Sequence, residues 1–173
     1  MKTWLITGCS SGIGKGIAKA VLESGDQAVV TARNKDKVLD IVEAYPDKAL
    51  AVSLDVCKQE SIDESVKLAY EKFGTIDVLV NNAGVPYGGL FTMTSIAKMR
   101  EVFEINVFAQ VQIMQLVARQ MMKQKSGCII NMCSVGGIET SPGYLAYGSS
   151  KAALIWITKS VSKELGRYNI RVN

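Results

Sequence analysis

Short apolar runs alternate along the chain with longer stretches of helical periodicity. The apolar runs predict six strands, near residues 4–6, 27–31, 49–54, 76–80, 128–132 and 170–172. The intervening stretches predict helices near residues 13–22, 35–44, 61–74, 95–123 and 144–167. Several strand candidates show little polar alternation, so both of their faces should be covered. The pattern therefore predicts an α/β fold with a parallel sheet and helices on both faces.

Local signals add detail to this outline. Ser61 and Glu64 form a capping-box pattern that should open the third helix, which ends near Gly74. No linker, internal repeat or low-complexity segment divides the chain, so residues 1–173 are expected to form one domain. The sequence stops inside the last apolar run, so we expect the final strands to be incomplete and the parent protein to be longer.

Composition narrows the chemistry. The 173 residues are 48% hydrophobic, which excludes a disordered chain, and the absence of His excludes His-based catalysis and His-ligated metal. The four cysteines form no CxxC pair, so no metal site is predicted. Scattered thiols without a signal peptide indicate the reducing cytoplasm. A net charge of +4 without a dense basic run argues against nucleic acid, and no apolar run is long enough for a membrane span.

The segment Thr7–Gly14 joins the first predicted strand to the first predicted helix. Gly8 permits a tight turn, and Gly12 and Gly14 let the backbone approach a phosphate at the helix start. A flexible Gly-Ser connection is the simpler alternative. In this position the loop indicates a doubly wound, Rossmann-like domain that binds a dinucleotide. The expected cofactor contacts in the loop are Gly8, Ser10, Ser11, Gly12, Ile13 and Gly14.

The end of the second predicted strand bears on the choice of dinucleotide. An acidic residue there would bind the ribose 2′-hydroxyl of NAD(H), but the segment Thr31–Asn34 carries no carboxylate. Arg33 can instead form a forked pair with the 2′-phosphate of NADP(H), and the alternative is that it is an ordinary solvated Arg. We therefore favour NADP(H) and keep NAD(H) as the alternative.

Further motifs follow in a specific order along the chain. The loop at 7–14 matches a TGxxxGxG pattern, residues 81–84 read NNAG, and residues 147–151 match YxxxK. Ser134 lies 13 residues before Tyr147, and Asn106 falls in the long fourth helix. In this combination the sequence resembles the short-chain dehydrogenase/reductase superfamily over essentially its whole length.

The resemblance implies a catalytic tetrad of Asn106, Ser134, Tyr147 and Lys151. It implies that Tyr147 moves a proton, that Lys151 also holds the cofactor ribose, and that Ser134 positions the substrate oxygen. It further implies a helix kink at Asn106 with a water relay to Lys151. The resemblance also places cofactor contacts at Asp55, Val56, Asn82, Ala83 and Gly84, of which Asp55 could equally cap a turn.

The residues themselves support part of this assignment. Tyr147 and Lys151 are four residues apart, so they share one helix face. This face is mostly apolar, and burying a Lys ammonium there costs folding free energy unless the charge has a function. The Lys151 ammonium would favour the deprotonated form of the Tyr147 phenol. The alternatives are structural: a snorkelling Lys151, a turn-forming Ser134 and an Asn106 that only packs helices. With no His present, a Ser134-based hydrolase triad is excluded.

Together these features predict an NADP(H)-dependent oxidoreductase that interconverts a small carbonyl compound and its alcohol. A non-catalytic dinucleotide-binding sensor or regulator is the alternative. Relative to the family, the substrate lid and the final strand are absent from the sequence. The apolar run Leu154–Ile157 and the family habit of pairing the two long helices favour a homo-oligomer, although a core on both sides of the helix would explain the run as well.

Overall fold

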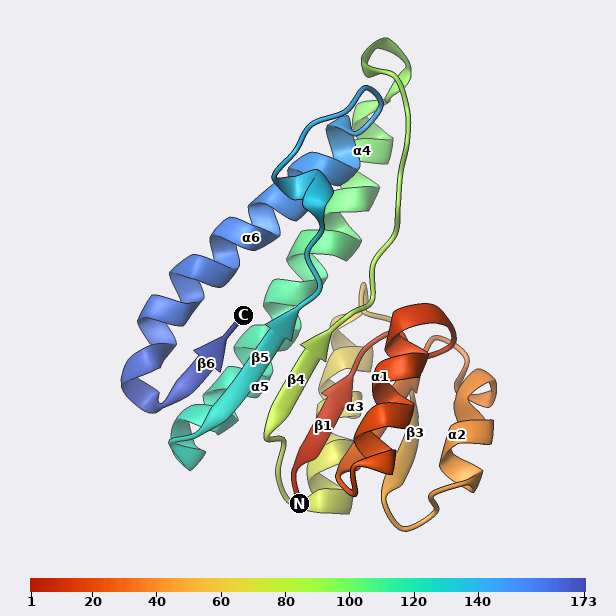
Figure 1. The fold of residues 1–173 in the computed structure, drawn as a ribbon, viewed down its shortest axis with the longest axis vertical. Coiled ribbons are helices and arrows are strands. Elements are labelled where there is room, and N and C mark those ends of the chain that lie inside the picture. Colours follow the sequence, from red (N-terminus) through yellow and green to blue (C-terminus); the bar gives the residue numbers. More distant parts are fainter.

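A computed structural model describes all residues, 1–173 (Figure 1). Six parallel strands form one sheet in the order β3-β2-β1-β4-β5-β6. The strands are β1 (Thr3–Ile6), β2 (Gln27–Ala32), β3 (Ala49–Ser53), β4 (Val78–Asn81), β5 (Gly127–Asn131) and β6 (Ile170–Val172). The predicted parallel, doubly wound α/β fold is therefore confirmed.

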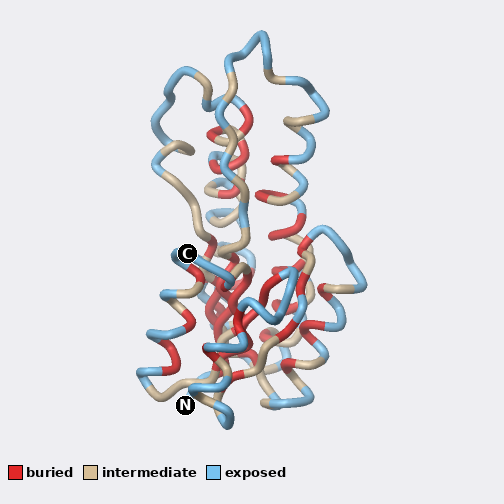
Figure 2. The backbone as a smooth tube through the Cα atoms, turned by 90° about the vertical axis from the view of Figure 1, so that its right-hand side faces the viewer, coloured by how far each residue is buried: buried red, intermediate tan, exposed pale blue.

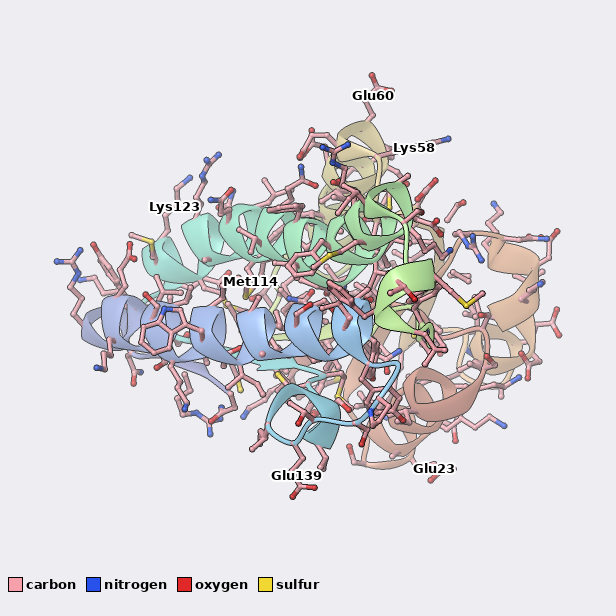
Figure 3. The ribbon with its side chains drawn as sticks, turned by 90° about the horizontal axis from the view of Figure 1, so that it is seen from above. Glu23, Lys58, Glu60, Met114, Lys123 and Glu139 are labelled. Atoms are coloured by element: carbon pink, nitrogen blue, oxygen red, sulfur yellow. The ribbon has the colours of Figure 1, made fainter.

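The helices lie on both faces of this sheet. They are α1 (Gly12–Glu23), α2 (Leu39–Glu43), α3 (Gln59–Phe73), α4 (Ile96–Phe103), α5 (Ala109–Gln124) and α6 (Leu145–Leu165). Helices α1 and α2 pack on one face, and α3, α5 and α6 pack on the other. Seen from above (Figure 3), α6 runs alongside α4 and α5, and Met114 lies between them. None of the helices combines the length and apolar composition needed to cross a membrane.

Three predicted helices differ from the structure. The capping-box prediction is wrong: α3 begins at Gln59 after Lys58, and the Ser61 hydroxyl instead accepts the Asp55 backbone N–H at 3.0 Å. The predicted helix at 35–44 is a 3₁₀ turn followed by the five-residue α2. The predicted helix at 95–123 is interrupted at Glu104–Phe108 by a π-helical turn that separates α4 from α5.

The core consists of two apolar layers, one on each side of the sheet. In β1, Leu5 points into the layer under α3, α5 and α6, and Ile6 points into the layer under α1 and α2. Both side chains are fully buried, and burial of this kind contributes about 1.5–3 kcal/mol for each. The unbroken apolar runs of the strands are thus explained by a sheet that is covered on both faces.

The strand order places a crevice at the carboxyl ends of the strands. The chain first builds outward from β1 to β3 and then crosses to β4 on the other side of β1. At such a switch point the loops after β1 and β4 diverge and leave room for a ligand. The loops after β4 and β5 extend far beyond this edge of the sheet (Figure 1), and buried residues become sparse there (Figure 2).

Candidate active site

The glycine loop lies between β1 and α1 at this edge. Gly8 and Gly12 have φ values of +73° and +57°, a region that favours glycine. A Cβ on Gly8 would lie 3.0 Å from the Ala83 Cα, and a Cβ on Gly14 would collide with the Asn82 amide and the Gly8 carbonyl. These glycines therefore allow α1 and the loop after β4 to approach the loop closely.

Thr7 and Asn82 hold the loop in place. The buried Thr7 Oγ1 accepts the backbone N–H groups of Asn82 and Ala83 at 2.9 and 2.8 Å. In return, the Asn82 Nδ2 donates to the Thr7 and Gly8 carbonyls at 2.9 and 3.1 Å. The Asn82 side chain is thus directed to the glycine loop. The sequence analysis did not single out Thr7 for this role, although Thr7 is the first residue of the motif.

A groove of about 340 Å³ opens beside this loop. It brings together many of the predicted cofactor residues, namely Gly8, Ser10, Ser11, Arg33, Asp55, Val56, Asn82, Ala83 and Gly84. Other lining residues were not predicted: Ala32, Leu54, Cys57, Val85 and Ile105. Gly12, Ile13 and Gly14 form the first turn of α1 beside the groove but do not line it, and the Ile13 side chain is exposed.

The groove has the features that a dinucleotide requires. Ser11 is the N-cap of α1 and lines the groove, and its side chain makes no capping hydrogen bond, so the N–H groups of the first turn have no side-chain cap. Arg33 is exposed at the rim and forms no salt bridge. Asp55 Oδ1 accepts the Cys57 N–H at 3.2 Å, so Asp55 makes the turn-capping contact and also lines the groove.

Tyr147 and Lys151 lie one turn apart on α6, as their spacing predicts. Lys151 is only 6% exposed, and its Nζ donates to the Met132 carbonyl at 2.6 Å. The Nζ lies 5.9 Å from the centre of the Tyr147 ring. Burial lowers the pKa of Lys151, partly opposed by the nearby Cys133. Lys151 forms no salt bridge with a carboxylate, and its burial shows that it is not a snorkelling surface residue.

Asn106 lies in the π-helical turn and is fully buried. Its Oδ1 accepts the Val85 N–H at 2.9 Å, and its Nδ2 donates to the Val85 carbonyl at 3.0 Å and the Ser150 hydroxyl at 3.1 Å. A Cβ on Gly84 would lie 3.2 Å from Asn106 Oδ1 and 3.6 Å from Lys151 Nζ. Gly84 therefore allows Asn106 and Lys151 to meet beside the groove.

Ser134 caps a 3₁₀ turn that follows β5. Its Oγ accepts the Gly136 N–H at 3.1 Å, so the turn-forming role expected as an alternative is present. Gly137 and Gly148 lie at the contact between this turn and α6, where added Cβ atoms would lie 2.8 Å from the Ala152 nitrogen and 2.6 Å from the Gly136 oxygen respectively. This close contact brings Ser134 to the same side of the sheet as Tyr147.

Ser134 and Tyr147 line one pocket of about 660 Å³. The pocket is also lined by Pro86, Tyr87, Gly88, Val135, Gly136, Glu139, Ser141 and Tyr144. Tyr144 packs edge-on against Tyr147, with ring centres 6.2 Å apart. Glu139 projects outward from the turn after β5 (Figure 3) and supplies the one charged group in this lining. A mixed aromatic and polar wall thus surrounds the two hydroxyl groups.

The fold and the site define an α/β dinucleotide-type domain with a Ser, Tyr and Lys constellation at the carboxyl edge of its sheet. The profile of the short chain dehydrogenase family matches residues 2–173. The chain belongs to this family.

Curated relatives and solved structures agree with this assignment. An uncharacterized oxidoreductase from Staphylococcus epidermidis is 34% identical over 171 residues, which are 99% of this chain and 74% of the relative. A 3-oxoacyl-[acyl-carrier-protein] reductase from Thermotoga maritima is 37% identical in an alignment of 175 positions, gaps included, that covers 99% of this chain and 71% of that protein.

Two structures illustrate the likeness in three dimensions. A short-chain dehydrogenase from Streptomyces avermitilis superimposes with a TM-score of 0.96 at 39% identity, covering 99% of this chain and 64% of that chain. A 7α-hydroxysteroid dehydrogenase complexed with NADH and 7-oxo glycochenodeoxycholic acid gives 0.94 at 34% identity, covering 99% and 68%. The sequence thus spans roughly two thirds to three quarters of these relatives.

Proposed function

We propose that this chain supplies the cofactor-binding and catalytic residues of an NADP(H)-dependent oxidoreductase acting on a carbonyl compound or its alcohol. The observation that carries the proposal is the shared pocket of Ser134 and Tyr147, with Lys151 buried one helical turn further along α6. All four tetrad side chains are present, and no observation favours a non-catalytic sensor.

The groove residues support a dinucleotide in an extended position. In this proposal, the glycine loop and the start of α1 hold the pyrophosphate, and Asp55, Val56 and residues 82–84 line the adenosine end. Arg33 at the rim would pair with the 2′-phosphate of NADP(H). The similar 7α-hydroxysteroid dehydrogenase structure contains NADH, so NAD(H) is the competing cofactor to test.

The residues of this chain have defined tasks in the proposed reaction. The bound nicotinamide supplies or accepts the hydride. Because Ser134 Oγ already accepts the Gly136 N–H, its own hydrogen is available to donate to the substrate oxygen. Tyr147 would give its hydroxyl proton to that oxygen in reduction and recover a proton in oxidation.

Lys151 and Asn106 support this proton transfer. One N–H of the Lys151 ammonium is used by the Met132 carbonyl, which leaves the others for the cofactor ribose or for a relay past Asn106. In this proposal the Lys151 ammonium lies 5.9 Å from the centre of the ring that carries the reacting Tyr147 hydroxyl. The bonds of Asn106 to Val85 and Ser150 fix the helix turn beside Lys151.

Exposed apolar side chains support a homo-oligomer, and free cysteines support a location in the reducing cytoplasm. Trp156 in α6 is 74% exposed although it belongs to an apolar run, so the core of this chain does not cover that side of the helix. Phe108, at the end of the π-helical turn, is also exposed. All four cysteines are free. A monomeric mass by sedimentation at micromolar concentration would contradict the oligomer.

A parallel fluorescence titration with NADPH and NADH tests the cofactor, and turnover of a carbonyl panel tests the reaction. Tyr147→Phe is expected to lower turnover by about 10²–10⁴-fold while leaving the NADPH dissociation constant near the wild-type value. Tyr168→Phe, on the turn after α6, is the control and should retain full turnover. Unchanged turnover in Tyr147→Phe would refute its assigned role.

A further inference from the structure

Gln110 connects two walls of the cofactor groove. It is the second residue of α5, is 1% exposed, and was not among the predicted site residues. Its Nε2 donates to the Ala83 carbonyl at 2.6 Å and to the Ile105 carbonyl at 3.1 Å. Ala83 follows β4 and Ile105 belongs to the π-helical turn, and both line the groove. One amide thus ties together two groove-lining segments that are 22 residues apart.

The π-helical turn makes the Ile105 carbonyl available for this contact. In an α-helix the Ala109 N–H would donate to the Ile105 carbonyl, but here it donates to Glu104. The Gln110 side chain supplies a donor to Ile105 within the same turn. The irregular backbone that places Asn106 is therefore stabilised by the residue that also contacts Ala83.

The Ala83 peptide group is held from both sides. Its N–H donates to Thr7 Oγ1 at 2.8 Å, and its carbonyl accepts from Gln110. Two residues further on, Asn106 binds both backbone groups of Val85. Three buried side chains therefore fix the backbone of residues 83–85: Thr7 directly after β1, Gln110 in α5 and Asn106 in the π-helical turn. Of these three, Gln110 is the one that the family motifs in the sequence do not include.

Stability alone does not account for a glutamine at this position. The Oε1 of Gln110 is buried without a hydrogen-bond partner, and the neighbouring Asn81 Oδ1 is in the same situation. An unpaired buried amide oxygen costs folding free energy that an apolar side chain of similar shape would not. The two donor contacts to groove walls are the benefit that the residue provides.

We propose that Gln110 is a positioning residue for the cofactor: its amide fixes the spacing between residues 83–85 and the π-helical turn, and so the shape of the groove. This inference rests on the proposed dinucleotide function. It predicts that loss of the amide weakens cofactor binding more than it affects folding, because preorganised walls reduce the ordering that binding requires.

The test compares Gln110→Met with Gln124→Met. Gln124 lies at the other end of α5, and its Nε2 also donates to a backbone carbonyl, that of Ile76 at 3.4 Å, away from the groove. We expect the NADPH dissociation constant to rise about tenfold in Gln110→Met and to stay unchanged in Gln124→Met. Fluorescence titration well below the melting temperature measures both.

A second readout needs no cofactor. Amide hydrogen exchange of the free chain should become faster at residues 83–85 and 105–109 in Gln110→Met only. If wild-type chain binds neither NADPH nor NADH, the proposed cofactor is contradicted, and faster exchange at these residues still supports the positioning role. Exchange and affinity both at wild-type values, with or without a lower melting temperature, would overturn it.

Gln110→Asn keeps an amide but is one methylene too short to reach both carbonyls. It provides the same comparison if Gln110→Met does not melt cooperatively, and it should show the same loss of affinity. If neither variant folds, Gln110 is required for folding itself and the proposal is overturned.

Discussion

The groove beside the glycine loop and the pocket lined by Ser134 and Tyr147 lie at the same edge of the sheet but are built differently. The groove is lined by residues at and after strand ends. Its walls are tied together by the buried side chains of Thr7, Asn106 and Gln110 and by the half-buried Asn82. The pocket is lined mainly by the loops after β4 and β5. These loops are largely exposed (Figure 2). Within them, Phe91 and Ile138 are 76% and 77% exposed. A backbone hydrogen bond from Gly89 to Gly143, at 2.9 Å, joins these loops.

The groove and the pocket differ in what their residues reveal about a ligand. A groove fixed by buried hydrogen bonds to the sheet tolerates little change, so its residue types indicate the ligand chemistry. A pocket formed by extended loops can change its lining without disturbing the core, so the fold does not determine the substrate. Variants on the two sides should therefore affect different measurements.

The largest effect is expected from Gly14→Val. A side chain there would collide with the Asn82 amide and the Gly8 carbonyl, so we expect loss of dinucleotide binding and destabilisation by about 3 kcal/mol. Urea unfolding and NADPH titration measure the two effects. Gly16→Ala, in the same helix with nothing near its Cβ, should be neutral or stabilising by up to about 1 kcal/mol. Equal stability and equal NADPH affinity in the two variants would show that the groove is not tightly packed around Gly14.

Arg33→Ala should have the next largest effect. Loss of a forked ion pair would raise the NADPH dissociation constant about tenfold or more and leave NADH within about twofold. Lys48→Ala removes the same charge at the start of β3, on the opposite edge of the sheet, and serves as control. If both dinucleotides weaken equally, Arg33 does not discriminate between them.

Cys9, in the glycine loop, should produce a smaller change in stability that depends on pH. Burial raises its pKa from the ordinary 9.0 to about 12. The unfolded chain loses this proton above pH 9 while the folded chain keeps it, so stability falls as pH rises from 9 toward 12. By pH 10 the loss relative to Cys9→Ala should be about 1 kcal/mol in urea unfolding. An identical pH slope in wild type and Cys9→Ala would contradict the buried thiol.

The smallest effect on stability is expected on the substrate side. Ile138→Ser should change the free energy of unfolding by less than about 0.5 kcal/mol and leave the NADPH dissociation constant unchanged, because the side chain is exposed. KM for apolar carbonyl substrates should change severalfold, since this loop borders the pocket. A large loss of stability would show that the loop is part of the folded framework.

The strands and the order of the elements could be predicted from the sequence because apolar runs correspond directly to buried strands. Each predicted strand overlaps an observed one, and β1 illustrates why, since its successive residues Leu5 and Ile6 serve opposite core layers. Helix boundaries were less predictable. Ser61 has the pattern of a cap, but its hydroxyl is used by Asp55 from outside the helix. The π-helical turn depends on the bond of Asn106 to Val85, 21 residues away, which helical periodicity does not record.

For the site, the motifs located the residues that line the groove and the pocket but not those that hold its backbone. Thr7 and Gln110 bind main-chain groups. Every residue has these groups, so the partner cannot be recognised from the amino-acid sequence. Asp55 shows the opposite difficulty, since capping and cofactor contact both require a carboxylate, and the structure shows the capping bond. The roles assigned to the tetrad and to the cofactor contacts remain predictions for the experiments above.

The order of the strands also has a consequence for how the chain is synthesised and folds. Asn82 binds the carbonyls of Thr7 and Gly8, which lie 75 and 74 residues earlier in the chain. The first βαβ unit can pair β1 with β2 soon after both leave the ribosome, but the glycine loop lacks its clamp until β4 has emerged and docked beside β1. The glycine loop is thus encoded among the first residues, but its hydrogen bonds to Asn82 form only after a long-range, late step of folding.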